Sequence, residues 1–384
     1  MILNTSLNLT IFNIFSGYIG RPSTPTPGQS RLAIILLISA HILNLPPLNT
    51  PTPNLMAKQH FSRRDFIKTS AVGAAGLMVG CRQSSTSDSP YNAHGLPTMV
   101  LGKTGVRLPR LAIGCGSRWC SIESEEAALN MMTYALDHGL YYWDTAHQYG
   151  NKKLGFASEE RLGKLLKTRR KEVFLATKVD AREPDEAKKM IEDSLRRLQT
   201  DHLDMLQIHS IRSMEEVEQL GQKGGVVDVV RQMKAEGVTR FIGFTGHTSA
   251  EAMKAMAQRY ELDNMLIALN HHQQGKQAFE EQAVPAAKRL GLGVMVMKVI
   301  RPREQVKTLA VQDLLRYALS LSQVDGAVVG MDSLDVVKAN IALLKDFQPM
   351  STPEMEQMQA ALAPFYQHPG LQWMQPGYRD GHLA

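Results

Sequence analysis

Four ionisable residues have the side-chain types needed to move a proton to or from a carbonyl oxygen. Asp144, Lys178 and His209 each end a short apolar run, and Tyr149 follows Asp144 by five positions. A buried Asp and Lys pair with each other, and an ammonium beside a phenol stabilises the phenolate, which lowers a tyrosine pKa that is normally about 10. A tyrosine tuned in this way is a general acid near neutral pH, and His209 can donate a hydrogen bond to a carbonyl oxygen. The set predicts protonation of an alkoxide as a hydride reaches its carbon.

The elements that position these residues repeat along the chain. Eight short apolar runs recur at intervals of roughly 25 to 36 residues, each followed by a loop and an amphipathic helix. Continuous apolar strands that alternate with helices predict a parallel sheet buried on both faces. A closed (β/α)8 TIM barrel is favoured over an open doubly wound sheet, because no Gly-x-Gly-x-x-Gly turn follows an early strand. The expected strands are residues 111–114, 141–144, 173–178, 205–209, 241–245, 266–270, 293–298 and 327–330.

Helix starts and a hairpin complete the predicted α/β fold. Ser124, Ser158 and Ser249 are expected to begin three of the helices. Residues 98–110 are apolar on both sides of Gly102-Lys103-Thr104-Gly105 and predict an N-terminal β-hairpin. The Gly-Lys-Thr is not a phosphate loop, because Pro97 stands where that motif needs glycine. We expect the barrel to span residues 96–366 and a C-terminal tail to follow at 367–384.

Composition places the chain among globular proteins and confines its basic excess to one end. Hydrophobic residues make up 43% of the chain, which excludes disorder and collagen. Six Lys and Arg residues but only one acid, Asp65, lie in residues 1–81, so nearly all of the net charge of +6 belongs to that segment. The body has no net attraction for phosphate backbones, and we expect no nucleic-acid partner. The three cysteines are too few for a zinc ribbon or a cysteine-ligated iron–sulfur cluster.

The basic segment has the layout of an export signal. Residues 1–55 contain no acid and no lysine, and their apolar run at 32–43 is too short to span a membrane, so we expect a non-native or disordered extension upstream of a start at Met56. Ser62-Arg63-Arg64-Asp65-Phe66-Ile67-Lys68 resembles the twin-arginine motif and precedes a Gly/Ala-rich apolar segment at 71–80. We expect residues 56–81 to be a twin-arginine signal peptide and 82–95 a polar linker.

The end of this signal allows two outcomes. Met78-Val79-Gly80-Cys81 resembles a lipobox, in which case Cys81 becomes a lipidated N-terminus. Plain cleavage nearby is the alternative. The protein is accordingly expected to be exported, either as a periplasmic protein or as a membrane-anchored lipoprotein, with the twin-arginine export machinery as a partner.

Residues 98–345 resemble the aldo-keto reductases. The resemblance includes the hairpin and all four residues of that family's Asp/Tyr/Lys/His tetrad, in order: Asp144, Tyr149, Lys178 and His209. The segments that carry it are Leu111–Gly114, Tyr142-Trp143-Asp144-Thr145-Ala146-His147-Gln148-Tyr149-Gly150, Ser158-Glu159-Glu160-Arg161-Leu162-Gly163, Ala176-Thr177-Lys178-Val179 and Leu206-Gln207-Ile208-His209-Ser210. The resemblance implies a (β/α)8 barrel that binds NADP or NAD across its C-terminal mouth.

The same resemblance implies which residues hold the cofactor. Asp332 stands where the family often has a basic or hydroxyl residue, and its charge would repel a 2′-phosphate, so the choice between NADP and NAD stays open. Leu266, near the usual strand-six Gln position, cannot bind the nicotinamide amide. Lys298 is an unusual residue for the barrel mouth, and an ion pair with a neighbouring acid is its alternative role. The expected cofactor contacts are Gly114, Thr245, Asn270, Lys298, Gly330, Ser333 and Asn340.

Other residues near the expected mouth have more than one interpretation. Cys115 and Cys120 lie in the first strand–helix loop, either as a disulfide or as two free thiols. His271 and His272 are neighbours on a strand and point to opposite faces, so we expect no metal site there. Four aromatic or imidazole side chains are candidates for the carbonyl pocket: Trp119, His147, Trp373 and Tyr378.

The function that follows is an exported aldo-keto reductase or alcohol dehydrogenase. A small aldehyde or ketone would be reduced to an alcohol, or the reverse. The alternative is a cofactor-loaded binding, regulatory or redox-sensing subunit with slow or no turnover. This alternative arises because free NADPH is not expected outside the cytoplasm.

Overall fold

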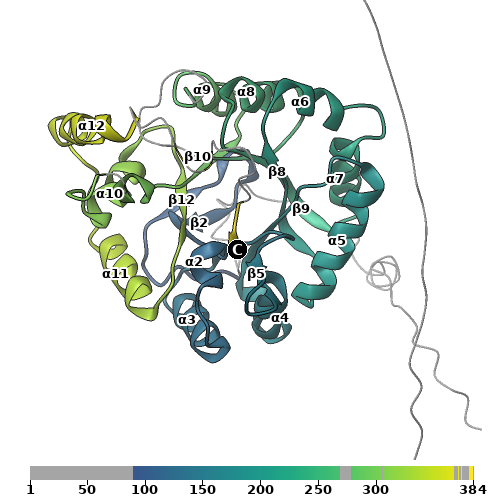
Figure 1. The fold of residues 1–384 in the computed structure, drawn as a ribbon, viewed down its shortest axis with the longest axis horizontal. Helices are drawn as coiled ribbons and strands as arrows, with labels where there is room; N and C mark the ends of the chain where they lie inside the picture. The colour runs from purple at the N-terminus through teal and green to yellow at the C-terminus, as the bar shows by residue number, and fades with distance from the viewer. Residues whose placement is uncertain are drawn as a thin grey trace, which may run out of the picture. The chain divides into compact units, whose positions relative to one another are not determined.

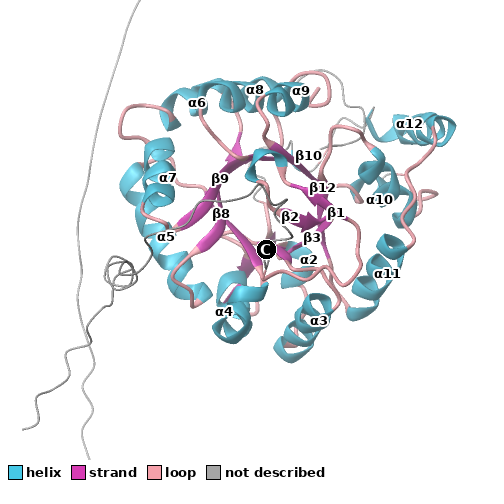
Figure 2. Ribbon diagram, turned by 180° about the vertical axis from the view of Figure 1, so that it is seen from behind, coloured by secondary structure: helices cyan, strands magenta, loops and turns pink. Residues whose placement is uncertain are grey.

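The computed structural model describes residues 90–268, 278–304, 306–366, 371, 373 and 380–383, all within the unit Arg82–Ala384. Eight parallel strands close into a barrel, and helices surround it (Figure 1; Figure 2 shows it from behind). The predicted TIM barrel is therefore confirmed. The strands are β3 (Leu111–Gly114), β4 (Tyr142–Asp144), β7 (Phe174–Val179), β8 (Leu203–Ile211), β9 (Thr239–Gly246), β10 (Asn264–Ala268), β11 (Gly293–Met297) and β12 (Gly326–Gly330).

The strands follow the chain order around the barrel, and β12 closes the ring by pairing with β3. All six residues of β7 and all five of β10 and β11 are buried, as a parallel sheet covered by helices on the outside and filled inside requires. The surrounding helices are α2 (Ser117–Cys120), α3 (Glu125–Asp137), α4 (Ser158–Arg169), α5 (Pro184–Leu198), α6 (Met214–Leu220), α7 (Val226–Ala235), α8 (Ala250–Arg259), α9 (Ala283–Arg289), α10 (Val311–Ser320), α11 (Leu334–Lys345) and α12 (Thr352–Tyr366).

Serine side chains begin helices in two different ways. Ser124 and Ser249 are N-caps, whose hydroxyls accept hydrogen bonds from the backbone amides of Ala127 and Ala252. Ser158 also begins a helix, but Ala157 is the N-cap, and the Ser158 hydroxyl donates to the carbonyl of Cys115 at 2.7 Å. That bond ties the start of α4 to the end of β3, next to the tetrad.

The predicted hairpin packs at the N-terminal ends of the barrel strands. It consists of β1 (Thr98–Val100), a 3-10 turn (Gly102–Thr104) and β2 (Arg107–Pro109). Gly102 has a φ of 47°, and a Cβ there would lie 2.2 Å from the backbone nitrogen of Gly293, so only glycine fits. The hairpin therefore leaves the opposite, C-terminal mouth of the barrel to the functional residues.

Both flanking segments contact the barrel where they are described. Tyr91, in the expected linker at 82–95, stacks on Tyr141 with ring centroids 5.1 Å apart and donates a hydrogen bond to Asp204. In the expected tail, β13 (His382–Leu383) pairs with β5 (Gly150–Asn151), which also pairs with β6 (Phe156–Ala157). The yellow end of the chain lies over the middle of the ring in Figure 1. The sequence analysis predicts only a polar linker and a tail for these two segments, and neither contact with the barrel.

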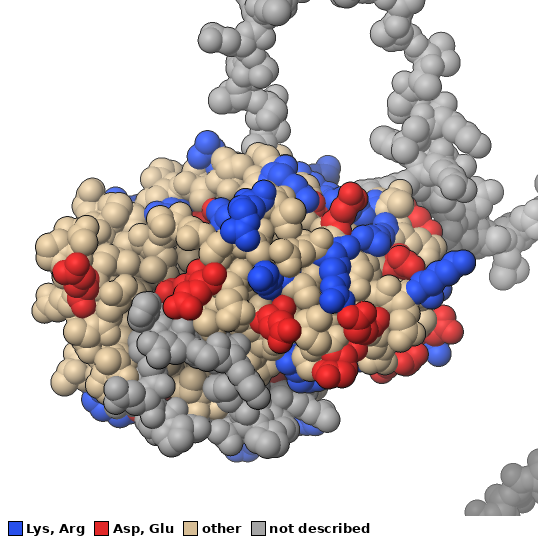
Figure 3. All heavy atoms as spheres, turned by 90° about the horizontal axis from the view of Figure 1, so that it is seen from above, with Lys and Arg blue, Asp and Glu red and all other residues tan. Residues whose placement is uncertain are grey.

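The surface carries both signs of charge. Basic and acidic side chains lie among one another on the face shown in Figure 3. Within the described part of the chain, no helix is both long enough and apolar enough to cross a bilayer.

Candidate active site

The four predicted tetrad residues meet at the C-terminal mouth of the barrel. Asp144 ends β4, Lys178 lies near the end of β7, His209 lies near the end of β8, and Tyr149 immediately precedes β5. Adjacent parallel strands bring these ends together, since β4 pairs with β7 and β7 with β8. All four side chains are buried. Residues that are spaced along the sequence thus form one cluster that is buried away from bulk water.

Asp144 and Lys178 form a buried ion pair. The Lys178 ammonium bonds to a carboxylate oxygen of Asp144 and donates a second hydrogen bond to the carbonyl of Thr145 at 2.7 Å. Burial raises the pKa of Asp144, and the Lys178 charge opposes that shift. The Lys178 nitrogen lies 4.9 Å from the centroid of the Tyr149 ring, so the cation is close enough to stabilise negative charge on the phenol.

His209 is held as a neutral hydrogen-bond donor. The side-chain nitrogen of Gln148 contacts His209 Nδ1, and with Gln148 as the donor the neutral ring carries its proton on Nε2, which lies 3.5 Å from Asp380 Oδ2. Burial lowers the pKa of His209 to about 4, so the imidazole is uncharged at neutral pH. The His209 and Tyr149 rings pack edge to face with centroids 5.7 Å apart. Both can therefore donate to one oxygen placed between them.

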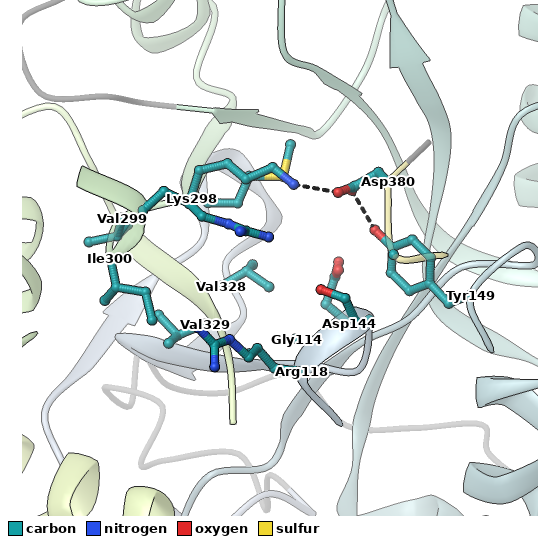
Figure 4. Close-up of a pocket in the computed structure, with 16 residues that line it drawn as sticks. Gly114, Arg118, Asp144, Tyr149, Lys298, Val299, Ile300, Val328, Val329 and Asp380 are labelled. Atoms are coloured by element: carbon teal, nitrogen blue, oxygen red, sulfur yellow. Dashed lines mark hydrogen bonds and ion pairs between the residues drawn. The ribbon is translucent and has the colours of Figure 1, made fainter. Parts of the chain in front are cut away.

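A residue that the sequence analysis missed, Asp380, sits in this place. The Tyr149 hydroxyl donates to Asp380 Oδ2 at 2.7 Å, and Lys298 pairs with Oδ1, as the dashed lines in Figure 4 show. The Nε2 atoms of His209 and His247 each lie 3.5 Å from Oδ2. Burial works against ionisation of this carboxyl, but the Lys298 charge and the contacts with the two histidines outweigh it and hold the pKa of Asp380 well below its ordinary value.

The segment that carries Asp380 is fitted to the site. Gly381 has a φ of 72° and packs on the Tyr149 ring, where a Cβ would lie 2.0 Å from the ring carbon Cδ1. The next two residues pair with β5, beside Tyr149. Asp380 is 231 positions from Tyr149 in sequence, and no local pattern could have connected the two.

A cavity continues from the tetrad along the ends of β11, β12 and β3. Gly114 and Gly330 form part of its wall, and a Cβ at Gly330 would lie 2.9 Å from the side chain of Arg118. Lys298 also lines it and follows β11 with a φ of 65°, a strained backbone conformation of a kind that clusters at functional sites. Three of the predicted cofactor residues, Gly114, Lys298 and Gly330, therefore share this cavity with Asp144 and Tyr149. Figure 4 labels all of these except Gly330.

The other predicted cofactor residues have structural contacts of their own. Ser333 is the N-cap of α11 and accepts a hydrogen bond from the amide of Val336, and Asn340 is buried on the same helix. The Thr245 hydroxyl oxygen accepts a hydrogen bond from the backbone amide of Ser210 at 2.9 Å. Asn270 lies outside the described residues.

The charge of Asp332 is compensated. Arg118, in α2, pairs with Asp332 at 3.0 Å, and both side chains are partly exposed at the mouth. In the sequence alone, Asp332 is an isolated negative charge. The structure brings a guanidinium beside it from the first strand–helix loop, so the repulsion of a 2′-phosphate is weaker than the sequence alone predicts.

Burial and contacts decide the roles of the two cysteines and of three candidates for the carbonyl pocket. Cys115 and Cys120 are free, buried thiols, and burial raises the pKa of both. Trp119 is fully buried with the Arg161 guanidinium over its ring, and Trp373 packs against Phe365. His147 bonds to Asp193 at 3.1 Å. None of these three side chains lines the cavity beside the tetrad.

The remaining expectations concern metals and three residues outside the described part. His271, His272 and Tyr378 lie outside the described residues. Among the residues that are described, no group of three or more His, Cys, Asp or Glu side chains is arranged to hold a metal ion.

Comparison with known proteins identifies the family. The model of the aldo/keto reductase family matches residues 112–301, a range that includes the whole tetrad. Residues 112–301 are an aldo/keto reductase domain. A second model, of the twin-arginine translocation pathway signal sequence, matches residues 60–80 and confirms that part of the leader as an export signal.

Individual proteins that resemble this chain are distant from it in sequence. An uncharacterized oxidoreductase of Bacillus subtilis, YrpG, is 29% identical over 51% of this chain and 64% of its own length, so the match spans less than two thirds of that relative. L-galactose dehydrogenase of Arabidopsis thaliana is 24% identical over 69% of this chain and 94% of its own. The aldo-keto reductase yakc [NADP(+)] of Schizosaccharomyces pombe is 30% identical over 45% and 52%.

Solved structures agree on the fold. An aldo-keto reductase from Bacillus halodurans superposes with a TM-score of 0.58 at 23% identity, covering 69% of this chain and 96% of its own. An aldo/keto reductase from Klebsiella pneumoniae, solved in complex with NADP and acetate, gives 0.54 at 23% identity and covers 70% and 95%.

Proposed function

We propose that this aldo/keto reductase reduces an aldehyde or ketone to an alcohol with NADPH or NADH, or runs the reverse reaction. The observation that carries the proposal is the convergence of Tyr149, His209 and the Lys178–Asp144 pair at one buried point. Two uncharged donors face one oxygen position, and a cation stands beneath the phenol. Such a site stabilises charge that develops on an oxygen during reaction.

Each residue of the tetrad has its own role in the proposed reduction. Tyr149 and the Nε2 proton of His209 orient the carbonyl oxygen by hydrogen bonds, and Tyr149 transfers its proton to that oxygen as the alkoxide forms. Lys178, held in place by Asp144 and the carbonyl of Thr145, stabilises the phenolate left behind. A bound dihydronicotinamide would supply the hydride.

The cavity beside the tetrad fits such a cofactor. Gly114 and Gly330 line it, and Arg118 offers a cation at the mouth for a phosphate group. We assign Gly114, Lys298 and Gly330 to the part nearer the tetrad. Ser333 and Asn340 on α11, together with Thr245 and Asn270, complete the proposed contact set. The similar protein of Schizosaccharomyces pombe is described as an NADP(+) enzyme, and that of Klebsiella pneumoniae was solved with NADP. Both support a nicotinamide dinucleotide as the cofactor.

The choice between NADPH and NADH is expected to depend on the Arg118–Asp332 pair. Changing Asp332 to Ser removes the acid and frees the guanidinium, which should shift the ratio of kcat/KM values toward NADPH by about fivefold, since a like-charge contact near a surface costs on the order of 1 kcal/mol. Arg118→Ser should shift it toward NADH. Initial rates with both cofactors measure the ratio, and identical ratios in wild type and both variants would contradict this placement of the 2′-phosphate.

Steady turnover tests the proposed function itself. The purified protein, given NADPH or NADH and an aldehyde in excess, is expected to oxidise many equivalents of cofactor per site. Oxidation that stops after a single equivalent would favour the alternative, a cofactor-loaded sensing or regulatory subunit. Absorbance of the dihydronicotinamide follows both cases in one assay.

The export signal determines where this chemistry takes place. The proposed destination is the periplasm or a membrane surface, the latter if Cys81 is lipidated. Cell fractionation distinguishes the two: Arg63→Lys/Arg64→Lys should retain the protein in the cytoplasm, and Cys81→Ala should release it from membranes only if a lipid anchor exists. The proposed boundaries of the leader and linker, at residues 55, 81 and 95, would be checked by sequencing the mature N-terminus.

A further inference from the structure

A side chain of the same protein, Asp380, fills the position where the proposed carbonyl oxygen would bind. The Tyr149 hydroxyl and His209 Nε2 are the two donors that the proposed reaction needs at the carbonyl oxygen, and both face Asp380 Oδ2, at 2.7 and 3.5 Å. While the Tyr149 hydroxyl donates to Asp380, it cannot donate to a substrate. Asp380 and a carbonyl substrate therefore compete for one position.

More groups that favour negative charge surround Asp380 than an uncharged carbonyl oxygen would need. Lys298 pairs with Oδ1, and His247 Nε2 lies 3.5 Å from Oδ2, so two further groups that favour negative charge surround the position. His247 is buried and the Lys298 side chain is only 9% exposed, and Lys298 reaches the site from a strained backbone conformation directly after β11. Together these groups form a binding site suited to a whole carboxylate group.

Among the charged side chains that the structure describes around the cavity and the tetrad, the charges balance only with an anion at the Asp380 position. Asp144 compensates Lys178, and Asp380 compensates Lys298. The two nearby arginines are paired separately, Arg118 with Asp332 and Arg301 with Glu304. A neutral substrate that displaces Asp380 leaves a surplus positive charge in a buried site, which is costly, whereas a substrate with its own carboxylate replaces one negative charge with another.

We propose that the preferred substrates are 2-oxo acids and that Asp380 is the internal carboxylate they displace. This inference rests on the proposed reductase function, and it moves Lys298 from the proposed cofactor contacts to the substrate carboxylate. The ketone oxygen of a 2-oxo acid and one oxygen of the adjoining carboxylate lie side by side, as the two oxygens of Asp380 do. The ketone oxygen takes the place of Oδ2, facing Tyr149 and His209, and the carboxylate takes the place of Oδ1, beside Lys298.

The reaction then balances as the reduction of a 2-oxo acid to a 2-hydroxy acid. A C–H bond forms at the ketone carbon from the hydride of a dihydronicotinamide, which is thereby oxidised. The C=O π electrons become a lone pair on oxygen, and that oxygen takes the Tyr149 proton. The phenolate regains a proton from solvent, and the substrate carboxylate is unchanged.

The test compares phenylglyoxylate with its methyl ester, which has the same ketone but no charge. We expect the wild-type protein to prefer the acid in kcat/KM by at least about tenfold, although the ester is the more electrophilic ketone. Lys298→Met should lower that preference by about tenfold or more, as loss of one partner of a buried charge pair does. Asp380→Asn should lower KM for both compounds, because it weakens the internal competitor and leaves Lys298 in place.

Control variants separate this inference from misfolding and from failure of the proposed function. Lys298→Met/Asp380→Asn removes both charges together, so it keeps the charge balance and should still lose the preference for the acid. Lys234→Met removes a lysine on α7 that is ion-paired with Asp263, and it should leave the preference unchanged. Equal use of acid and ester by the wild type, unaltered by Lys298→Met, overturns the inference alone. Reduction of neither compound, nor of simple aldehydes, overturns the reductase proposal instead.

Discussion

Tyr149→Phe is expected to lower the turnover number for carbonyl reduction by about 10²–10⁴-fold, the range that general-acid catalysis contributes. The variant removes one oxygen and keeps the ring, which packs against His209 and Gly381. Folding and cofactor binding should therefore stay close to wild type. Initial rates with a saturating aldehyde give the turnover number, and quenching of protein fluorescence by NADPH gives the cofactor affinity.

Tyr142 provides a matched control for this variant. It is a fully buried tyrosine on β4, and its hydroxyl has no hydrogen-bond partner among the described residues. Tyr142→Phe thus makes the same chemical change a short distance along the chain and should leave turnover within about a factor of two, since it removes no group that faces the oxygen position. Near-normal turnover by Tyr149→Phe would rule out the tetrad assignment while leaving the barrel intact.

Lys178→Met is expected to abolish turnover and to destabilise the fold at the same time. The change leaves the buried Asp144 carboxylate without its cation, and breaking a buried pair typically costs about 3–5 kcal/mol. It also removes the positive charge beneath the Tyr149 ring. Urea denaturation measures the free energy of unfolding, and the aldehyde assay measures turnover.

A double variant separates the two effects of Lys178. Lys178→Met/Asp144→Leu removes both charges, and replacing a buried pair by apolar groups of similar size is often neutral for stability. The free energy of unfolding should recover most of the loss, whereas turnover should stay at the level of the single variant. Recovery of turnover together with stability would show that Lys178 is only a structural partner of Asp144.

Local sequence patterns were enough to predict the barrel and the positions of its tetrad. Apolar runs such as 111–114 and 241–245 are visible because a parallel strand is buried on both faces, and the ends of such strands meet at one mouth. Ser124 and Ser249 were correctly expected at helix starts because an N-cap is a local interaction. The neutral state of His209 follows from burial, which only the assembled barrel creates.

What sequence reasoning missed depends on contacts between distant segments. Asp380 reaches Tyr149 from the other end of the barrel sequence, and Arg118 reaches Asp332 across more than two hundred positions. A single aspartate or arginine in a polar loop has no periodicity or motif that reports its partner. The polar composition around Tyr91 predicts a linker, but its ring and hydroxyl both contact the barrel.

The pairing of β3 with β12 has a consequence for how the chain reaches its destination. These strands join the first and last units of the barrel, so Leu111 pairs with Ala327 across most of the domain. Until β12 is synthesised, β3 presents an open edge of unpaired backbone groups, which invites association with other unfinished chains. Contacts so far apart in sequence also form slowly. A chain truncated before β12 would keep the export signal with Arg63 and Arg64 but could not close the barrel. We expect such a chain in the aggregated fraction.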